Sequence, residues 1–262
     1  ASIALAEHVA GGEAEFAYMM NEKARRLGLR NTNFVNVTGL PSDDHYSTAN
    51  DLARLTIELI KNHPNHYEIY AERSFEYNGI NQTNRNKLLW RDLSVDGVKT
   101  GYTKKAGYCL VASARRDGMR LVSVVLGTSS DQDRMKESLK LLSFGFRNYD
   151  TQLLYRANSE ITRRKVFYGK SDAVSIIAPT DVYVTAPRGD LKSALTELSV
   201  PRHLEAPINK NDVIGSLAVV LAGEDEVTYE TKVLAADEIR EANLFGKVSD
   251  FFYLFYSELF GE

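Results

Sequence analysis

The sequence has little of several features that would narrow its class. It contains one cysteine, Cys109, so no internal disulfide can form. That cysteine stands in the apolar run Tyr108–Ala112, which predicts a small buried residue rather than a reactive thiol. No uncharged apolar run reaches about 18 residues, the length that a membrane-spanning helix requires. These absences exclude a disulfide-built scaffold and leave no candidate for a spanning helix.

Clustered positive charge is missing as well. The 32 lysines and arginines are outnumbered by 35 acidic residues, for a net charge of −3 at pH 7, whereas a duplex-binding domain presents a basic face. The short run Arg163–Lys165 is typical of a solvated strand edge. The five histidines lack metal-ligand spacing, since Pro64 separates His63 from His66, and no glycine-rich phosphate loop occurs. We therefore expect no nucleic acid, metal or cofactor.

What is present is enough apolar sequence for one large or two modest domains, because 44% of the 262 residues are hydrophobic. Residues 1–148 mix helical and strand patterns. Ser47 or Thr48 is placed to cap one helix, and Asp51 in its first turn is expected to cap it too. Asp117-Gly118 predicts a tight hairpin turn. We expect an α+β domain with helices over 1–10, 13–27, 48–62, 67–71 and 131–149 and strands over 74–78, 107–114 and 120–127.

From residue 149 the pattern changes to short apolar runs punctuated by glycine and proline. Several short strands at regular spacing predict a small all-β sandwich or barrel. We place the boundary near 148–151 and the β domain over 149–236. The expected strands are 165–168, 173–177, 182–186, 215–221 and 227–233.

The remaining stretch, residues 237–262, has the pattern of an amphipathic helix whose apolar side is rich in phenylalanine. So much aromatic surface favours an interfacial anchor that lies on a membrane surface through Leu244–Phe260. A helix docked on the protein or on a partner fits the pattern equally. Few basic residues line the polar side, which weakens its attraction to anionic lipid.

The segment Lys99-Thr100-Gly101 is the strongest candidate for chemistry, since it leads into a β-rich run. A strand edge there can pair with an extended peptide. Lys99 and Thr100 would offer a cation and a hydroxyl to the terminal carboxylate of such a peptide, and Gly101 would allow close approach. The backbone N–H of Tyr102 could be half of an oxyanion hole. The alternative is an ordinary exposed lysine that enters a strand.

Several ordered motifs carry a resemblance to a known family. The chain resembles the penicillin-binding D-alanyl-D-alanine carboxypeptidases over essentially its whole length. The matching segments are Asn33-Phe34, Thr38–Leu40, His45–Leu52, Asn81–Trp90, Val95–Gly101, Ala106–Tyr108 and Leu110–Ala114.

The resemblance implies a fold and a reaction. The fold is an α/β transpeptidase/β-lactamase-like domain over residues 1–148, then the small all-β sandwich over 149–236 and the amphipathic anchor helix over 237–262. The reaction is removal of the terminal D-alanine from peptidoglycan stem pentapeptides by a serine peptidase that penicillins acylate. Lys99, Thr100, Gly101 and Tyr102 match its catalytic strand, and Lys99, Thr100 and Arg85 match substrate-binding positions. Arg85 as a surface arginine is the alternative.

The resemblance also implies parts that the sequence does not contain. The family uses a Ser-x-x-Lys pair as nucleophile and base, followed by a Ser-x-Asn motif, and neither occurs here. Because the chain opens inside a helical pattern, we expect that an N-terminal part is missing; a lineage that has lost catalysis is the alternative.

Partners and location follow from the same resemblance. Expected partners are the pentapeptide, β-lactam antibiotics and the membrane surface, in the periplasm against the inner membrane. The rivals are a β-lactamase, which shares Lys-Thr-Gly, and a catalytically silent wall-binding or shape-maintaining homologue.

Overall fold

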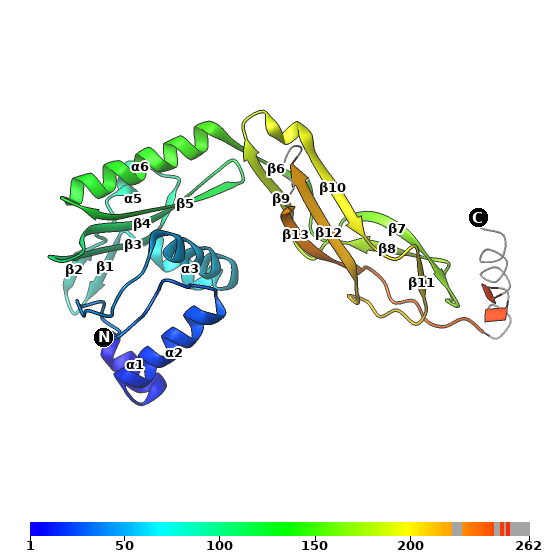
Figure 1. Ribbon diagram of the computed structural model, residues 1–262, viewed down its shortest axis with the longest axis horizontal. Coiled ribbons are helices and arrows are strands. Elements are labelled where there is room, and N and C mark those ends of the chain that lie inside the picture. Colours follow the sequence, from blue (N-terminus) through cyan, green and yellow to red (C-terminus); the bar gives the residue numbers. More distant parts are fainter. Residues whose placement is uncertain (222–226, 244–246, 249, 252–262) are drawn as a thin grey trace. The chain divides into compact units, whose positions relative to one another are not determined.

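The computed structural model describes residues 1–221, 227–243, 247–248 and 250–251 (Figure 1). The chain divides into two compact units, Ala1–Arg147 and Asn148–Glu262, each with its own core. The first mixes helices with antiparallel strands and the second is built from strands, so the expected fold class is confirmed.

A three-stranded antiparallel sheet forms the centre of the first unit. Its strands are β3 (Val95–Thr103), β4 (Gly107–Arg116) and β5 (Met119–Thr128), in the order β3-β4-β5. The predicted turn joins β4 to β5: Asp117 and Gly118 both have positive φ, 48° and 87°, as tight hairpin turns require. The order leaves β3 at an edge of this sheet.

Helices cover both faces of the sheet because apolar side chains alternate along its strands. On one face, Leu110, Ala112 and Ala114 of β4 pack against Leu142 of α6 (Asp131–Asn148) and Leu88 of α5 (Leu88–Arg91). On the other, a second cluster joins β3, β4 and β5 to α3 (Ala49–Asn62), α4 (Pro64–Tyr67) and the 3-10 helix η1 (Glu68–Ala71). Its members are Tyr67, Val98 and Val111, with Leu52, Leu59, Ile60, Tyr70, Val122 and Val124 around them.

The N-terminal helices begin and end close to their expected positions. They are α1 (Ser2–Ala10), which ends at Gly11 in the left-handed conformation, and α2 (Glu13–Arg26). Thr48 caps α3, as predicted, by accepting a hydrogen bond from the backbone of Asp51. The expectation that Asp51 also caps this helix is wrong. Its carboxylate is buried and accepts from the backbone N–H of Asn31 at 2.8 Å and the hydroxyl of Thr32 at 2.7 Å, so it fixes the preceding loop.

A separate two-stranded hairpin lies between η1 and α5. It consists of β1 (Ser74–Tyr77) and β2 (Ile80–Thr83), joined by Asn78 and Gly79, whose φ angles are 51° and 73°. The expected strand over 74–78 corresponds to β1, but β2 was not predicted. The Asn-Gly pair is the signal that could have revealed it.

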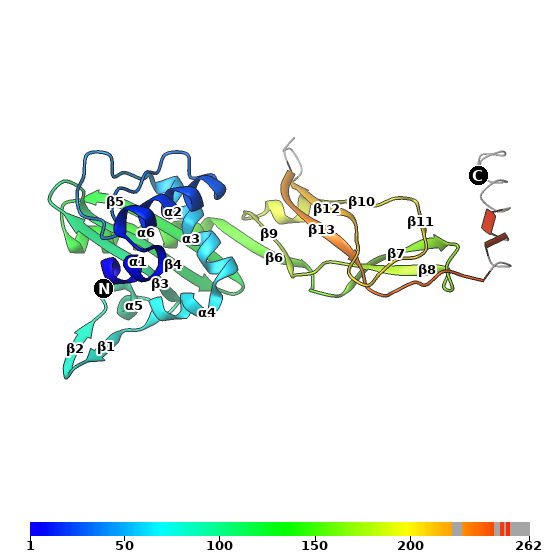
Figure 2. The ribbon, with the colours of Figure 1, turned by 90° about the horizontal axis from the view of Figure 1, so that it is seen from below.

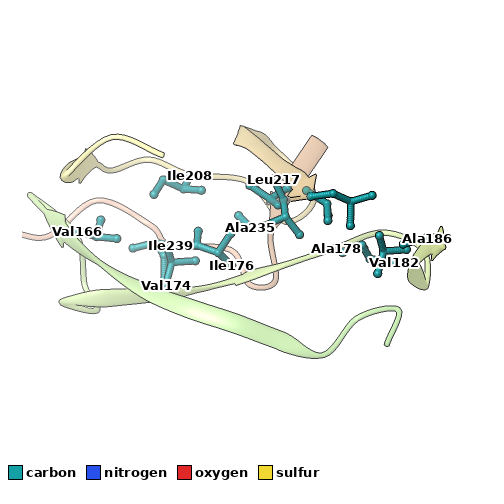
Figure 3. Packing of buried hydrophobic residues seen from close by; sticks show 14 residues of the cluster. Val166, Val174, Ile176, Ala178, Val182, Ala186, Ile208, Leu217, Ala235 and Ile239 are labelled. Carbon is teal, nitrogen blue, oxygen red and sulfur yellow. The ribbon is translucent and has the colours of Figure 1, made fainter. Parts of the chain in front are cut away.

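The second unit is a six-stranded sheet in the order β10-β12-β13-β8-β7-β11 and a two-stranded sheet of β6 and β9. Its strands are β6 (Tyr149–Tyr155), β7 (Glu160–Phe167), β8 (Ala173–Ile177), β9 (Val182–Pro187), β10 (Ala194–Ser199), β11 (His203–Glu205), β12 (Val213–Leu221) and β13 (Val227–Ala235), with a 3-10 turn, η2 (Asp190–Ser193), before β10. Their inward side chains, among them Val174, Ile176 and Leu217, form one apolar core (Figure 3). The unpredicted strands β6, β10 and β11 bury few residues, so they lack a clear alternating pattern.

The expected helix over 237–262 is wrong in its first part. Ile239 is buried in the core of the β unit and exchanges backbone hydrogen bonds of 2.8 and 2.9 Å with Ile208, and Glu241 forms a bridge with Gly169. Residues 237–243 therefore complete the β unit. Of the proposed anchor Leu244–Phe260, only residues 247, 248, 250 and 251 are described, and these are helical; the rest lies outside the described residues. Within the described ranges, we find no helix that combines the length and the apolar character needed to cross a bilayer.

Candidate active site

A groove of about 560 Å³ lies along β3 in the first unit. Its floor comprises Lys99, Thr100, Gly101 and Tyr102, and Arg85 lies in its wall, so all five predicted site residues line one cavity. Much of the remaining wall is formed by Phe34, residues 36–40 and His45. The structure thus brings together every side chain that the sequence analysis singled out at this site.

The β3 strand has an open edge along this groove. It pairs with β4, with Lys99 opposite Val111 and Gly101 opposite Cys109, and no other described strand pairs with it. An unpaired edge presents a row of backbone N–H and C=O groups that can add an extended peptide as a further strand. The local geometry therefore suits a peptide ligand.

Lys99 carries the positive charge of this strand. Its side chain reaches along β3, and the ammonium donates a hydrogen bond of 2.6 Å to the carbonyl of Thr100. Desolvation, followed by the positive charges of Arg85 and Arg134, lowers the pKa of Lys99 below its ordinary value. Cations that repel one another gain from a shared anion, so the charges at this end of the groove favour an anionic group.

Two asparagines fix the loop that presents Arg85. Asn84 donates to the carbonyl of Glu72 at 2.9 Å, and its side-chain oxygen accepts from the backbone N–H of Asn86 at 2.9 Å. Asn86 is 1% exposed and donates to the carbonyl of Gly97 at 2.9 Å. Because buried amides are costly unless bonded, this set ties the Arg85 loop firmly to β3.

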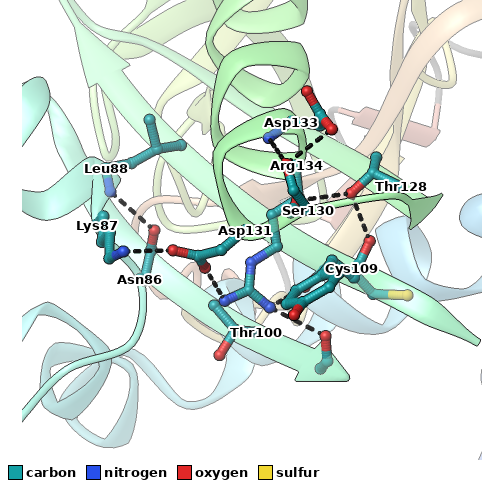
Figure 4. Close-up of polar contacts among 12 residues, drawn as sticks. Asn86, Lys87, Leu88, Thr100, Cys109, Thr128, Ser130, Asp131, Asp133 and Arg134 are labelled. Atoms are coloured by element: carbon teal, nitrogen blue, oxygen red, sulfur yellow. Dashed lines mark hydrogen bonds and ion pairs between the residues drawn. The ribbon is translucent and has the colours of Figure 1, made fainter. Parts of the chain in front are cut away.

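Arg134 bonds the backbone of the groove strand, and the sequence analysis did not single it out (Figure 4). It lies buried on α6, and its guanidinium donates to the carbonyls of Gly101 at 3.0 Å and Cys109 at 3.3 Å. Asp131 pairs with the same guanidinium and also with Lys87, at 2.5 Å. Arg134 lies on the same face of α6 as the buried Ser138 and Leu142, because the three residues are four positions apart. An arginine on the apolar stripe of a predicted helix was the available signal.

The opposite wall is a loop organised by its own side chains. The side-chain oxygen of Asn36 accepts from the backbone N–H of Thr38 at 3.2 Å and of Gly39 at 2.8 Å, while its amide donates to the carbonyl of Leu40 at 2.9 Å. An ion pair of 3.1 Å joins Asp43 of this loop to Lys105, which follows β3. Both charges are exposed, so this pair adds little stability.

A second polar network lies where β3 begins. The carboxylate of Asp96 accepts from the hydroxyl of Tyr67 at 2.9 Å and pairs with Arg120 at 2.7 Å, and Arg120 also donates to the hydroxyl of Ser113 at 2.8 Å. Burial raises the pKa of the Tyr67 hydroxyl, and the negative charge of Asp96 adds to the rise. Tyr67 therefore stays protonated at neutral pH and remains a donor to Asp96.

Cys109 differs from its expected environment. The thiol is half-buried and lines the groove, so the prediction of a buried residue is wrong. The reason is its partner on β3, Gly101, which has no side chain to cover it. Within the described ranges, no group of three or more His, Cys, Asp or Glu side chains is placed to hold a metal ion.

Comparison with protein families finds two matches in chain order. Residues 1–130 match the D-alanyl-D-alanine carboxypeptidase family, and residues 149–241 match the family described as penicillin-binding protein 5, C-terminal domain. Together these matches account for most of both units.

Individual relatives agree with the family matches. The chain is 43% identical to the D-alanyl-D-alanine carboxypeptidase DacA of Escherichia coli (strain K12), an alignment that covers 100% of this chain and 65% of the relative. It therefore spans only about two thirds of the length of that relative.

Two solved structures are similar as well. Penicillin-binding protein 5 from Haemophilus influenzae superposes with a TM-score of 0.74 at 38% identity, covering 91% of this chain and 70% of that one. Penicillin-binding protein D2 from Listeria monocytogenes, in its cefotaxime-bound form, matches at 35% identity and a TM-score of 0.52, covering 55% of this chain and 60% of that one.

Gly97 and Gly101 of β3 should respond differently to alanine. A Cβ at Gly97 would lie 2.5 Å from the hydroxyl oxygen of Tyr67, whereas at Gly101 it would lie 3.8 Å from Cys109. We expect Gly97→Ala to lower the free energy of unfolding by about 1–3 kcal/mol through overpacking. Gly101→Ala, the matched control, should leave it within about 0.5 kcal/mol. Urea titration measures both, and equal losses would show that Tyr67 does not restrict β3.

Proposed function

The chain belongs to the D-alanyl-D-alanine carboxypeptidase family, and from that premise we propose that it forms the substrate-binding part of a serine-type D-Ala-D-Ala carboxypeptidase. Its substrate is the peptidoglycan stem pentapeptide, from which it removes the terminal D-alanine. One observation carries the proposal: the open edge of β3 and two cationic side chains, Lys99 and Arg85, share a single groove.

In this proposal each end of the scissile bond has a place in the groove. The peptide adds to β3 as an extended strand, and its terminal carboxylate lies between Lys99 and Arg85, with the hydroxyl of Thr100 as a further donor. Gly101 leaves room for the backbone of the substrate. The N–H of Tyr102 points at the developing oxyanion as one of its two donors. The ring of Tyr102 lies 4.2 Å from that of Tyr108, which holds this part of β3 in place.

In the proposed reaction a Ser-x-x-Lys pair supplies the nucleophile and the base, and this sequence does not contain that pair. A serine hydroxyl attacks the carbonyl between the two D-alanines while a lysine takes its proton, and D-alanine leaves with a proton on its nitrogen. Water then hydrolyses the acyl-enzyme and frees the serine. β-Lactams acylate the same serine, a proposal supported by the cefotaxime-bound relative.

The absent serine–lysine pair also supports a second candidate, a catalytically silent wall-binding or shape-maintaining homologue. Covalent labelling of the complete gene product with a fluorescent penicillin separates the two, because only the enzyme forms an acyl bond. A β-lactamase is disfavoured by the match of residues 149–241 to a penicillin-binding protein domain. Comparison of penicillin hydrolysis with D-Ala-D-Ala cleavage tests that rival.

We also propose a location in the periplasm, at the outer face of the inner membrane. The phenylalanine-rich pattern of Leu244–Phe260 supports a peripheral anchor. The β unit would then hold the first unit away from the membrane surface and closer to the peptidoglycan.

Lys99→Ala should weaken acylation by penicillin and peptide turnover in the complete gene product. The expected loss is about 2–4 kcal/mol of transition-state stabilisation in kcat/KM, because the substrate carboxylate loses its cation. Lys104→Ala is the matched control, since Lys104 is exposed on the same segment but does not line the groove. Unchanged kcat/KM in Lys99→Ala would refute the assigned role.

The lowered pKa of Lys99 predicts the alkaline limb of the pH profile. As pH rises through that pKa, Lys99 loses its charge and its hold on the carboxylate. The fall in kcat/KM should therefore begin below about pH 10.4, the value of an unperturbed lysine. Arg85→Gln removes a neighbouring positive charge and should move the limb to higher pH. Arg73→Gln, an exposed arginine outside the groove, should not move it; a limb that stays in place in Arg85→Gln contradicts the coupling.

Removal of residues 244–262 should release the protein from membranes without loss of folding. The cut falls after the described backbone contacts of Ile239 and Glu241, so the β unit keeps them. Membrane fractionation of cells that express the truncated gene product measures the effect. A truncated protein that still sediments with membranes argues against the anchor.

A further inference from the structure

The hairpin of β1 and β2 presents an apolar face to solvent. All of its strand residues are exposed, and Figure 2 shows the hairpin projecting from the rest of the first unit. The register pairs Tyr77 with Ile80 and Phe75 with Gln82, so these four side chains share one face. Phe75, Tyr77 and Ile80 are 64%, 71% and 62% exposed. We call these four residues the aromatic face.

The chemistry of the aromatic face suits a neutral polar ligand that also has apolar surfaces. The rings of Phe75 and Tyr77 are nearly parallel, at 7°, with centroids 6.4 Å apart. None of the four side chains is charged, whereas Glu76 lies on the other face, opposite Asn81. Ring faces pack against C–H surfaces, and the amide of Gln82 and the hydroxyl of Tyr77 can each donate and accept hydrogen bonds. Sugar rings offer both kinds of group and no charge.

The area of the face argues against a folded protein partner. At the exposures given, the three apolar side chains present roughly 400 Å². A stable protein–protein interface buries about 800 Å² on each partner. Three apolar side chains gathered on one face of a two-stranded hairpin nevertheless form a patch of the size that is often functional on a monomer. A narrow, extended ligand fits it better than a second copy of the chain.

The hairpin is continuous with the groove. β2 ends at Thr83, and the chain reaches Arg85 in the groove wall two residues later. Asn84, between them, donates to the carbonyls of Glu72 at 2.9 Å and Tyr70 at 3.4 Å, which anchors the base of the hairpin. The five residue steps from Ile80 to Arg85 can span at most about 17 Å, which is within the reach of an extended five-residue stem peptide.

From these observations we propose that the aromatic face binds the glycan strand of peptidoglycan, the neutral polymer of N-acetylated aminosugars that carries the stem peptides. The inference rests on the proposed function for its substrate, and it deepens that function: the groove takes the peptide end and the hairpin takes the sugar end. Free peptides and glycan-linked peptides are then distinguished by Phe75 and Tyr77.

The test uses the complete gene product and the variant Phe75→Ala/Tyr77→Ala. Glu76→Ala/Asn81→Ala, on the opposite face of the same hairpin, is the matched control. Binding to glycan strands stripped of stem peptides is measured by cosedimentation. Turnover is measured on a diacetylated Lys-D-Ala-D-Ala tripeptide and on a disaccharide pentapeptide. Thermal unfolding checks that both variants are folded, as substitution of exposed side chains should allow.

We expect the aromatic variant to bind glycan strands about tenfold more weakly than the wild type. Its kcat/KM on the disaccharide pentapeptide should fall by a similar factor through KM, with the tripeptide unaffected and the control unchanged throughout. Equal glycan binding by all three proteins overturns the inference. The inference is also overturned if the aromatic variant keeps glycan binding but no longer binds phosphatidylglycerol vesicles. It is overturned as well if the aromatic variant keeps glycan binding but no longer forms a dimer that the wild type forms. If the wild type binds glycan strands but cleaves neither peptide, the proposed function fails and the glycan site stands.

Discussion

The hydrogen bond from Arg134 of α6 to the backbone of β3 is the constraint on which the geometry of the site depends. An edge strand with one neighbour has half of its backbone groups unpaired and needs other contacts to stay in register. Arg134 supplies them by charge-assisted hydrogen bonds to Gly101 and to the partner residue Cys109. Asn86 bonds Gly97, and Asp96 bonds Tyr67 and Arg120, at the start of the same strand. β3 is therefore fixed at both ends while its outer edge stays open.

Local sequence rules predicted the elements that local chemistry determines. Thr48 caps α3, and Asp117-Gly118 turns β4 into β5, because each acts through its own backbone. Lys99 and Arg85 were predicted from ordered motifs, and they line the same groove. The contacts of Asp51 and Arg134 could not be predicted in this way, because their partners come from segments 19 to 33 residues away in the sequence. Ile239 shows the same limit: its apolar character suits a helix, but pairing with Ile208 makes it part of the β core.

A short segment, residues 84–86, connects the hairpin to the groove wall, so the positions of the two are linked. Asn84 bonds the residues before β1, and Asn86 bonds β3, so Arg85 is held between two anchors. A ligand that bridges the hairpin and the groove would meet a rigid junction rather than a loose loop. Rigid supports of this kind lower the entropy cost of binding a long, flexible substrate.

The open edge of β3 also bears on self-association of the protein. Exposed strand edges template pairing between identical chains, and natural proteins guard them with positive charge. Lys99 and Arg85 occupy that position here, so two copies approaching edge to edge would bring like charges together. The cations to which we assign the substrate carboxylate would thus also disfavour self-association through this edge. A carboxylate ligand that neutralised these charges would itself fill the edge, so at neutral pH the removal of the repulsion would coincide with occupation of the strand.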